Sequence, residues 1–195
     1  MDELRLNPVY YSPEHLALRE SVRRFVAAEI TPHVAAWDEV GGFPRELYRK
    51  AAEVGLLGIG FPEEFGGMPG VDYFHRLVAS IELAQAGSGG VAASLMSHTI
   101  GSPPLVAFGS PALKQRVLSE VLAGERIAAL AITEPSGGSD VAALKTSAVR
   151  DGDHYVVNGE KTFITSGMRA DYLTVAVRTD PAAKGAAGLS LLLIE

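Results

Sequence analysis

Residues 133–140 read Thr133-Glu134-Pro135-Ser136-Gly137-Gly138-Ser139-Asp140, and they mark the point at which the chain changes character. They follow a short apolar run, residues 127–133, that predicts a strand. Pro135 cannot continue a strand because it lacks an N–H donor, and the two glycines can adopt positive φ. The predicted loop exposes backbone N–H groups and the hydroxyls of Ser136 and Ser139, which suits a phosphate or carbonyl ligand. A plain surface turn of common turn-forming residues explains the same stretch equally well.

Upstream of this loop the pattern is helical. Ser12-Pro13-Glu14 is typical of a helix start, and apolar residues at three-to-four spacing extend that helix to Pro32. Further helices are predicted over residues 44–54, 72–84, 91–100 and 110–124. Residues 91–100 are nearly uncharged, so we expect that helix to be buried on all sides.

Downstream of the loop the pattern has a period of two. Strands are predicted at residues 127–133, 154–157, 161–165, 172–178 and 189–194. Asn158-Gly159 is the strongest hairpin signal, because a type I′ turn needs positive φ at both central residues, and Asp151-Gly152 predicts another tight turn. Consecutive strands joined by tight turns indicate an antiparallel sheet. We therefore predict an α+β fold, with an all-α helical domain over residues 1–126 and a β domain over residues 127–195.

The composition narrows the functional classes. Hydrophobic residues make up 47% of the 195 residues and charged residues 21%, which is enough for a globular core. A net charge of −6 without a basic run argues against a nucleic acid or an anionic membrane as partner. The absence of cysteine excludes disulfides and cysteine nucleophiles, and no apolar run reaches the roughly 18 residues of a membrane span. Residues 1–5 resemble neither a signal peptide nor a transit peptide, so we expect a soluble, cytoplasmic protein.

Three other features bear on chemistry. Phe163 and Thr165 alternate on one predicted strand, where a ring and a hydroxyl on one face would suit a planar cofactor. The residues alone favour the simpler interpretation, in which Phe163 packs in the core. Glu63 and Glu64 are adjacent carboxylates in a Pro/Gly turn, and such neighbours usually point apart into solvent. The five histidines show no metal-ligand spacing, so we expect no metal site.

Residues 130–140, LAITEPSGGSD, closely resemble the flavin-binding signature of the acyl-CoA dehydrogenase family. Residues 158–167, NGEKTFITSG, resemble that family's second signature at the expected separation. Residues 55–58 (GLLG) and 62–67 (PEEFGG) are similar to its usual N-terminal pattern. The resemblance covers nearly the whole chain. It implies an all-helical N-terminal domain, an antiparallel, β-barrel-like middle domain and a C-terminal helical bundle, with FAD between the last two.

The resemblance also implies a role for each motif residue. The cofactor-binding set comprises Leu130, Ala131, Ile132, Thr133, Gly138, Ser139, Phe163, Ile164 and Thr165. In that set, the Thr133 hydroxyl would face the isoalloxazine edge and Thr165 would bond near flavin N5. Ser139 would also meet the pantetheine of the substrate or the pyrophosphate region. Phe163 stands where the family often has a tryptophan against the flavin ring, a change that keeps the ring contact and removes the indole N–H.

The implied reaction is α,β-dehydrogenation of an acyl-CoA thioester to a trans-2-enoyl-CoA, with electrons passing to an electron-transfer flavoprotein. The resemblance implies a role in fatty acid β-oxidation and a homotetramer or dimer. The family's catalytic base is a glutamate of the C-terminal bundle, which these 195 residues do not contain. We therefore assign no catalytic residue, do not give Glu195 that role, and expect the 195-residue chain alone to be inactive. Two alternatives stay open: a monooxygenase or oxidase with the same fold, and a non-catalytic binding module.

Overall fold

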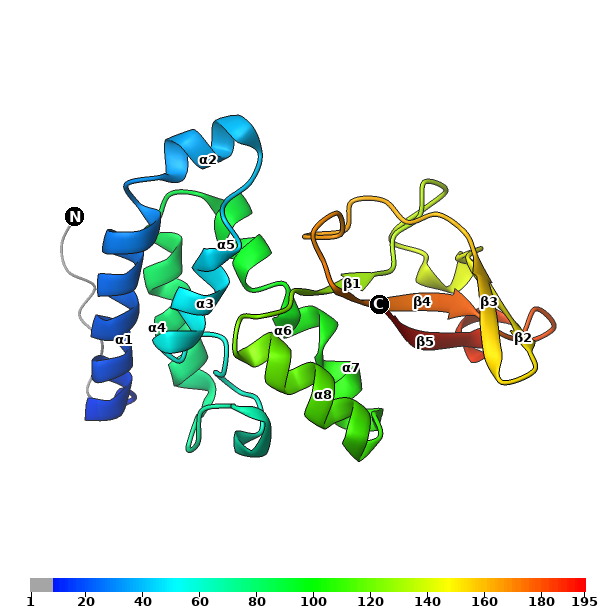
Figure 1. Ribbon diagram of the computed structural model, residues 1–195, viewed down its shortest axis with the longest axis horizontal. Coiled ribbons are helices and arrows are strands. Elements are labelled where there is room, and N and C mark those ends of the chain that lie inside the picture. The colour runs from blue at the N-terminus through cyan, green and yellow to red at the C-terminus, as the bar shows by residue number, and fades with distance from the viewer. Residues whose placement is uncertain (1–8) are drawn as a thin grey trace. The chain divides into compact units, whose positions relative to one another are not determined.

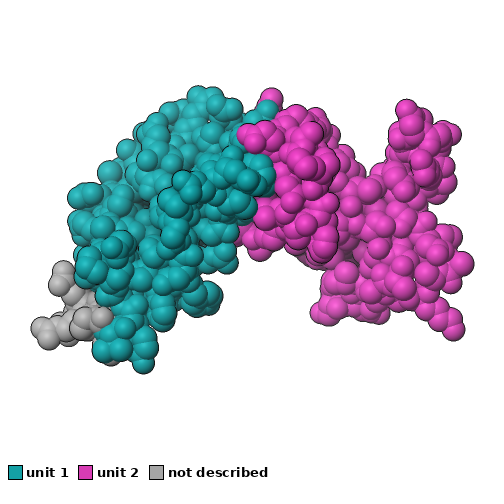
Figure 2. Space-filling view, turned by 90° about the horizontal axis from the view of Figure 1, so that it is seen from below, with its two compact units in different colours: residues 1–95, 118–125 teal, residues 96–117, 126–195 magenta. Residues whose placement is uncertain are grey.

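The computed structural model describes residues 9–195, which pack as two compact units. Figure 1 gives the order of the elements, and Figure 2 colours the two units separately. Unit 1 comprises the described residues up to Leu95 together with Leu118–Glu125, and unit 2 comprises Met96–Val117 and Arg126–Glu195. Helix α8 (Pro111–Leu122) therefore contributes to both units. Packing thus groups some helical residues with the strands, and the domain boundary at residues 126/127 stays a prediction.

Unit 1 is helical, as predicted. It contains α1 (Pro13–Phe25), the π-helical turn η1 (Val26–Ile30), α2 (Val34–Val40), α3 (Glu46–Glu53), the 3-10 turn η2 (Glu63–Phe65), α4 (Tyr73–Ala84) and α5 (Gly89–Leu95). The start of α4 is confirmed, because the Asp72 side chain accepts hydrogen bonds from the N–H groups of Phe74 and His75. The short helix α2 was not predicted.

The predicted helix over residues 91–100 is wrong in two respects. The segment forms two short helices, α5 and α6 (His98–Gly101), with a break at residues 96–97. It is also not buried on all sides, because Ala93, Thr99 and Ile100 are exposed. The break falls where the chain passes from unit 1 to unit 2.

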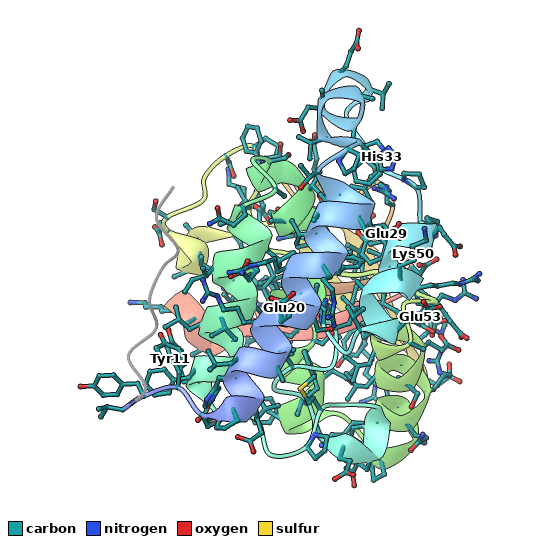
Figure 3. The ribbon with its side chains drawn as sticks, turned by 90° about the vertical axis from the view of Figure 1, so that its left-hand side faces the viewer. Tyr11, Glu20, Glu29, His33, Lys50 and Glu53 are labelled. Carbon is teal, nitrogen blue, oxygen red and sulfur yellow. The ribbon has the colours of Figure 1, made fainter. Side chains whose placement is uncertain are left out.

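A buried carboxylate joins α1 to α4 within unit 1. Glu82 is 2% exposed, and its oxygens accept hydrogen bonds from Arg19 Nε at 2.6 Å and Arg23 Nε at 3.1 Å. Burial acts to raise the pKa of Glu82, but the bonds from Arg23 and Arg19 outweigh it, and the pKa lies below its ordinary value. A more exposed pair, Lys50 Nζ and Glu29 Oε2 at 2.7 Å, links α3 to η1 (Figure 3).

Unit 2 is built around β4 (Tyr172–Arg178). β1 (Ala128–Ala131) pairs with β4 in parallel, and β5 (Leu189–Ile194) pairs with β4 in antiparallel register along its other edge. β2 (Ser147–Asp151) meets β4 at Ser147↔Arg178 and forms an antiparallel hairpin with β3 (His154–Asn158). The predicted antiparallel, barrel-like sheet is therefore corrected to a mixed and open one. The long connection from β1 to β4 permits their parallel pairing, which a tight turn could not.

The strand predicted at residues 161–165 does not form, and the hairpin at Asn158-Gly159 is wrong. The hairpin that does form turns at Gly152-Asp153, next to the second turn signal in the sequence. Gly159 instead allows the backbone to lie close to the Thr146 side chain, which a Cβ at position 159 would overlap. β2 was missed as a strand.

The remaining helices of unit 2 are α6, α7 (Pro103–Phe108) and the first part of α8. α6 lies directly on β1: Ser97 Oγ donates to the Ala128 carbonyl at 2.8 Å, and Thr174 Oγ1 donates to the Gly101 carbonyl at 2.6 Å. A Cβ on Gly101 would lie 2.8 Å from the Ala129 carbonyl carbon, so this contact requires glycine. Within residues 9–195, no helix has both the length and the apolar character needed to cross a membrane.

Glu82→Gln should destabilise unit 1 by about 3 kcal/mol, because it leaves two partly buried guanidinium groups without their shared charge. Urea unfolding of the two proteins measures this difference. Glu20→Gln is the matched control, since Glu20 lies on the same helix as Arg23, is half exposed and is 3.8 Å from that guanidinium (Figure 3). We expect the control to change stability by less than about 0.5 kcal/mol. Equal effects of the two substitutions would contradict this account.

Candidate functional site

The loop that follows β1 is closed by a tight turn. The N–H of Glu134 donates to the Gly137 carbonyl at 3.1 Å, and the N–H of Gly137 donates back to the Glu134 carbonyl at 3.0 Å. Residues 135–140 are exposed, whereas Glu134 is only 6% exposed. The loop therefore presents its serines, its glycines and Asp140 to solvent and turns the Glu134 carboxylate inward.

The Glu134 carboxylate accepts four hydrogen bonds within unit 2. One oxygen accepts from the Lys145 N–H at 2.7 Å, and the other accepts from the Thr146 N–H at 2.8 Å, the Thr146 hydroxyl at 2.6 Å and Lys161 Nζ at 2.9 Å. Burial acts to raise the pKa of Glu134, but the bonds from Thr146, Lys145 and Lys161 prevail and lower the pKa to about 2. Glu134 is therefore an ionised structural anchor at neutral pH.

The same network joins the two motifs. Lys161 Nζ also donates to the Ile132 carbonyl at 2.9 Å, and the N–H of Thr162 donates to the Thr133 carbonyl at 2.9 Å. Residues 132–134 and residues 161–162 are therefore in direct contact although 27 residues separate Glu134 from Lys161. Glu134, Thr146 and Lys161 are not among the functional residues predicted from the sequence. The signal that could have identified Glu134 is a carboxylate directly after the predicted strand at residues 127–133, at the start of a loop of turn-forming residues.

Residues 163–167 form a strained, irregular segment, not the predicted strand. Phe163 has φ +56° and Ser166 has φ +62°, both in the left-handed region that non-glycine residues rarely occupy. Ile164 packs against the hydrophobic core of the sheet, while the Phe163 side chain is 93% exposed. The prediction that Phe163 and Thr165 share one face of a strand is therefore wrong. This segment is not a strand with alternating side chains, and Ile164 is the residue that packs into the core.

The predicted cofactor-binding set contains three hydroxyls, and all three are left for a ligand. Among the described residues, the side chains of Thr133, Ser139 and Thr165 have no hydrogen-bond partner. Thr133 and Thr165 are half-buried and Ser139 is exposed. Gly138 lies against Thr133, where a Cβ would sit 3.3 Å from Thr133 Cγ2, so glycine keeps this side of the threonine open. Together with the exposed Phe163 ring, these groups can bind a flat ligand with polar edges.

The other predicted site residues lie deeper in unit 2. Leu130 and Ala131 belong to β1, opposite Thr174 and Val175, and Ala131 is part of the buried core. Ala131 can therefore reach a ligand only through its backbone. Ile132 and Ile164 are half-buried. Glu63 and Glu64 are both exposed in η2 of unit 1, as expected of adjacent carboxylates in a turn.

Unit 1 brings together three residues that the sequence did not connect. His15, Asp72 and His75 offer nitrogen and oxygen atoms that all lie within 4.8 Å of one another. The spacing rules applied to the sequence compare histidines along one helix. They could not find a group formed by residues 57 positions apart.

Comparisons with known proteins agree with these two motifs. The family model described as "Acyl-CoA dehydrogenase, N-terminal domain" matches residues 12–125, and that for the middle domain matches residues 129–195. The long-chain specific acyl-CoA dehydrogenase of Sus scrofa mitochondria is 38% identical over 186 residues, covering 95% of this chain and 43% of that protein. The chain thus spans less than half the length of this curated relative.

Solved structures show the same similarity. The crystal structure of a probable acyl-CoA dehydrogenase from Mycobacterium abscessus is 52% identical with a TM-score of 0.89, covering 94% of this chain and 48% of that one. A Bacillus anthracis acyl-CoA dehydrogenase, crystallised in complex with FAD, is 33% identical with a TM-score of 0.83, covering 97% of this chain and 32% of that one. Both also extend well beyond the residues matched here.

Glu134→Gln should destabilise unit 2 by about 3 kcal/mol at pH 7, because the amide cannot accept four donors and leaves the buried Lys161 ammonium unpaired. Since the pKa of Glu134 is depressed in the folded state, its contribution is fully present above pH 4.5 and is lost as the pH falls towards 2. Urea unfolding at several pH values measures both effects.

Glu160→Gln, at an exposed neighbouring position, is the matched control and should change stability by less than about 0.5 kcal/mol at any pH. A stability difference between parent and Glu134→Gln that stays constant from pH 7 to pH 3 would contradict the assignment of Glu134 as an ionised anchor.

Proposed function

The chain belongs to the acyl-CoA dehydrogenase family, and on that premise we propose that it forms part of an FAD-dependent acyl-CoA dehydrogenase. The proposed reaction is the α,β-dehydrogenation of an acyl-CoA thioester to a trans-2-enoyl-CoA. The observation that carries the proposal is the set of three hydroxyls, on Thr133, Ser139 and Thr165, that have no partner within residues 9–195 and lie in two segments that Glu134 and Lys161 hold together.

The residues present fit a flavin. Phe163 offers an exposed ring for contact with a flat heterocycle, and its left-handed backbone holds the ring out from the core. Thr133 and Thr165 offer hydroxyl donors for the heteroatoms of the isoalloxazine edge. The FAD complex of the related Bacillus anthracis protein supports FAD as the flavin.

We assign the individual roles as follows. Residues 130–133 line the flavin, with the Thr133 hydroxyl at the ring edge and the Thr165 hydroxyl near N5. Ser139, in the exposed loop, takes the pyrophosphate region or the pantetheine of the substrate. When bound, a flavin would supply the acceptor for the hydride that leaves the β-carbon as a base removes the α-proton.

None of the described carboxylates is assigned as that base. Glu134 is buried and ionised, with four donors on its two oxygens. Glu195 pairs with Arg116 Nη2 at 2.6 Å, and this bond lowers the pKa of Glu195, which makes it a weaker base. We place the base in a part of the protein beyond these residues.

The wider assignments rest on family membership. We propose an electron-transfer flavoprotein as acceptor, a cytoplasmic role in fatty acid β-oxidation and a homo-oligomeric assembly. We also propose domains at residues 1–126 and 127–195, which the ends of the two family matches, at 125 and 129, support.

The function is tested on the complete purified protein. We expect noncovalently bound FAD that is released on denaturation, bleaching of its absorbance by acyl-CoA without oxygen, and an enoyl-CoA product. Rapid reaction of the reduced, product-bound flavin with oxygen would identify an oxidase instead. Absence of both FAD and acyl-CoA turnover would contradict the proposal.

Thr165→Val removes one hydroxyl at nearly constant volume. Loss of that hydrogen bond should weaken FAD binding by about 1 kcal/mol and slow flavin reduction by acyl-CoA. Thr31→Val, at an exposed site in unit 1, is the control and should leave both quantities unchanged. Equal FAD affinity and equal reduction rates in all three proteins would remove Thr165 from the site.

Phe163→Gly separates strain from binding. Glycine adopts positive φ freely, so the variant should unfold at no lower urea concentration than the parent when both lack FAD. Its FAD dissociation constant should rise at least about tenfold, because the aromatic contact is lost. A variant that loses stability without FAD but binds FAD normally would show that Phe163 has a purely structural role.

A further inference from the structure

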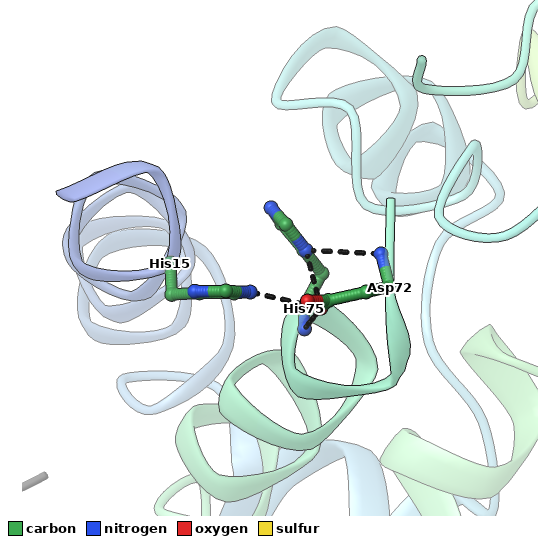
Figure 4. A group of neighbouring side chains, drawn as sticks. All are labelled: His15, Asp72 and His75. Carbon is green, nitrogen blue, oxygen red and sulfur yellow. Dashed lines mark hydrogen bonds and ion pairs between the residues drawn. The ribbon is translucent and has the colours of Figure 1, made fainter. Parts of the chain in front are cut away.

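A group of two imidazoles and one carboxylate lies on unit 1. His15 Nε2 is 2.8 Å from Asp72 Oδ1, and His75 Nδ1 is 2.9 Å from the same oxygen (Figure 4). The centroids of the two rings are 4.0 Å apart. His15 belongs to the first turn of α1, whereas Asp72 caps α4 and His75 belongs to its first turn.

Helix capping accounts for only part of this arrangement. Each histidine is the third residue of its helix, where its ring can bond to the capping residue of that helix. That local role would be complete without any contact between the helices. Instead, His15 Nε2 turns to the Asp72 carboxylate of the other helix, so three ligand-type atoms converge on one point.

The spacing of these atoms is close to that around a zinc ion. Zn–N and Zn–O bonds of about 2.0–2.2 Å place neighbouring ligand atoms of a tetrahedral site roughly 3.3 Å apart. The two measured distances to Asp72 Oδ1 are therefore only about half an ångström too short. An ion replacing the shared hydrogens would need these three atoms to move apart by a few tenths of an ångström.

A further hydroxyl is suitably placed to orient one ligand. Ser12 Oγ lies 2.9 Å from His15 Nδ1, so it can accept a hydrogen bond from Nδ1–H. In that tautomer the Nε2 lone pair points towards Asp72 and is available to a metal. That tautomer would lose one hydrogen bond, because in this structure the Ser12 N–H donates to the same Nδ1 atom at 2.8 Å.

The group is accessible. His15, Asp72 and His75 line a surface pocket of about 630 Å³, whose wall also includes Met68 and Pro69. The two histidine side chains are nearly buried, whereas the Asp72 side chain is 53% exposed. An ion bound here would be held from the protein side and would have a coordination position open to the pocket.

We propose that His15, Asp72 and His75 form a binding site for one divalent transition-metal ion of the zinc class. Two imidazoles with one carboxylate favour zinc over magnesium or calcium, which prefer oxygen ligands. The ion joins α1 to α4, two helices that also share the Glu82 network, and thereby stabilises unit 1. The site is independent of the proposed dehydrogenase activity, since it uses no residue of the two flavin motifs.

The test measures zinc binding to the purified, tag-free protein. Equilibrium dialysis against Zn²⁺ should give one ion per chain, and saturating Zn²⁺ should raise the melting temperature by about 5 °C or more. Asp72→Asn removes the charge but keeps a good helix cap, and His15→Gln removes one ligand. Each should weaken zinc binding at least about tenfold and abolish the stabilisation.

His33→Gln and His154→Gln are the matched controls, because both histidines are exposed and lie outside the group. They should bind zinc as the parent does. Binding that is absent in the parent, or that Asp72→Asn and His15→Gln leave unchanged, would overturn the proposal. Urea unfolding without metal shows that the variants are folded, and FAD content is expected to be the same in all five proteins.

Discussion

The buried carboxylate of Glu134 is the interaction on which unit 2 depends. A charge at this depth is unfavourable unless donors surround it, and four donors from Lys145, Thr146 and Lys161 do so. Those donors come from the two residues directly before β2 and from the long connection between β3 and β4. A single buried group therefore sets where three segments of irregular backbone lie. Without it, the loop after β1 and the segment before β4 would be joined only by the bonds that the Ile132 and Thr133 carbonyls accept from Lys161 and Thr162.

The buried network around Glu134 holds these segments in place without using the hydroxyl groups on their exposed side. The network uses the carboxylate, the lysine and the main chain, whereas the hydroxyls of Thr133, Ser139 and Thr165 keep no partner among the described residues. The left-handed backbone at Phe163 likewise separates a structural side chain from an exposed one, because Ile164 packs into the core and the Phe163 ring stays exposed. Such strain is maintained only where surrounding contacts determine the conformation, and it is concentrated at binding sites. Stability and ligand binding are thus assigned to different atoms of the same few residues.

In unit 1, carboxylates also join separate segments, but with different partners. Glu82 accepts hydrogen bonds from two arginines of α1, and Asp72 contacts two histidines, one from α1 and one from α4. Both carboxylates connect helices that lie far apart in the sequence, and both have a pKa below the ordinary value because of those partners. Asp72 differs in being half exposed beside a pocket. This exposure is what makes the second group a candidate for metal binding, while Glu82 is closed to any ligand.

The sequence by itself determined that a helical part precedes a strand-containing part, and it located the cap of α4 at Asp72 and the loop at residues 133–140, because these depend on local periodicity and turn chemistry. It also carried the family, through two motifs in the expected order. Only the tertiary structure decided that β1 and β4 pair in parallel, that residues 161–165 leave the sheet and that Asn158-Gly159 makes no hairpin. It alone brought Lys161 to Glu134 and His15 to Asp72. The physical reason is that a turn signal depends on about four consecutive residues. Packing between residues far apart in the sequence decides the burial of Ile164, the approach of Gly159 to Thr146 and the pairing of distant charges, and no local pattern encodes that packing.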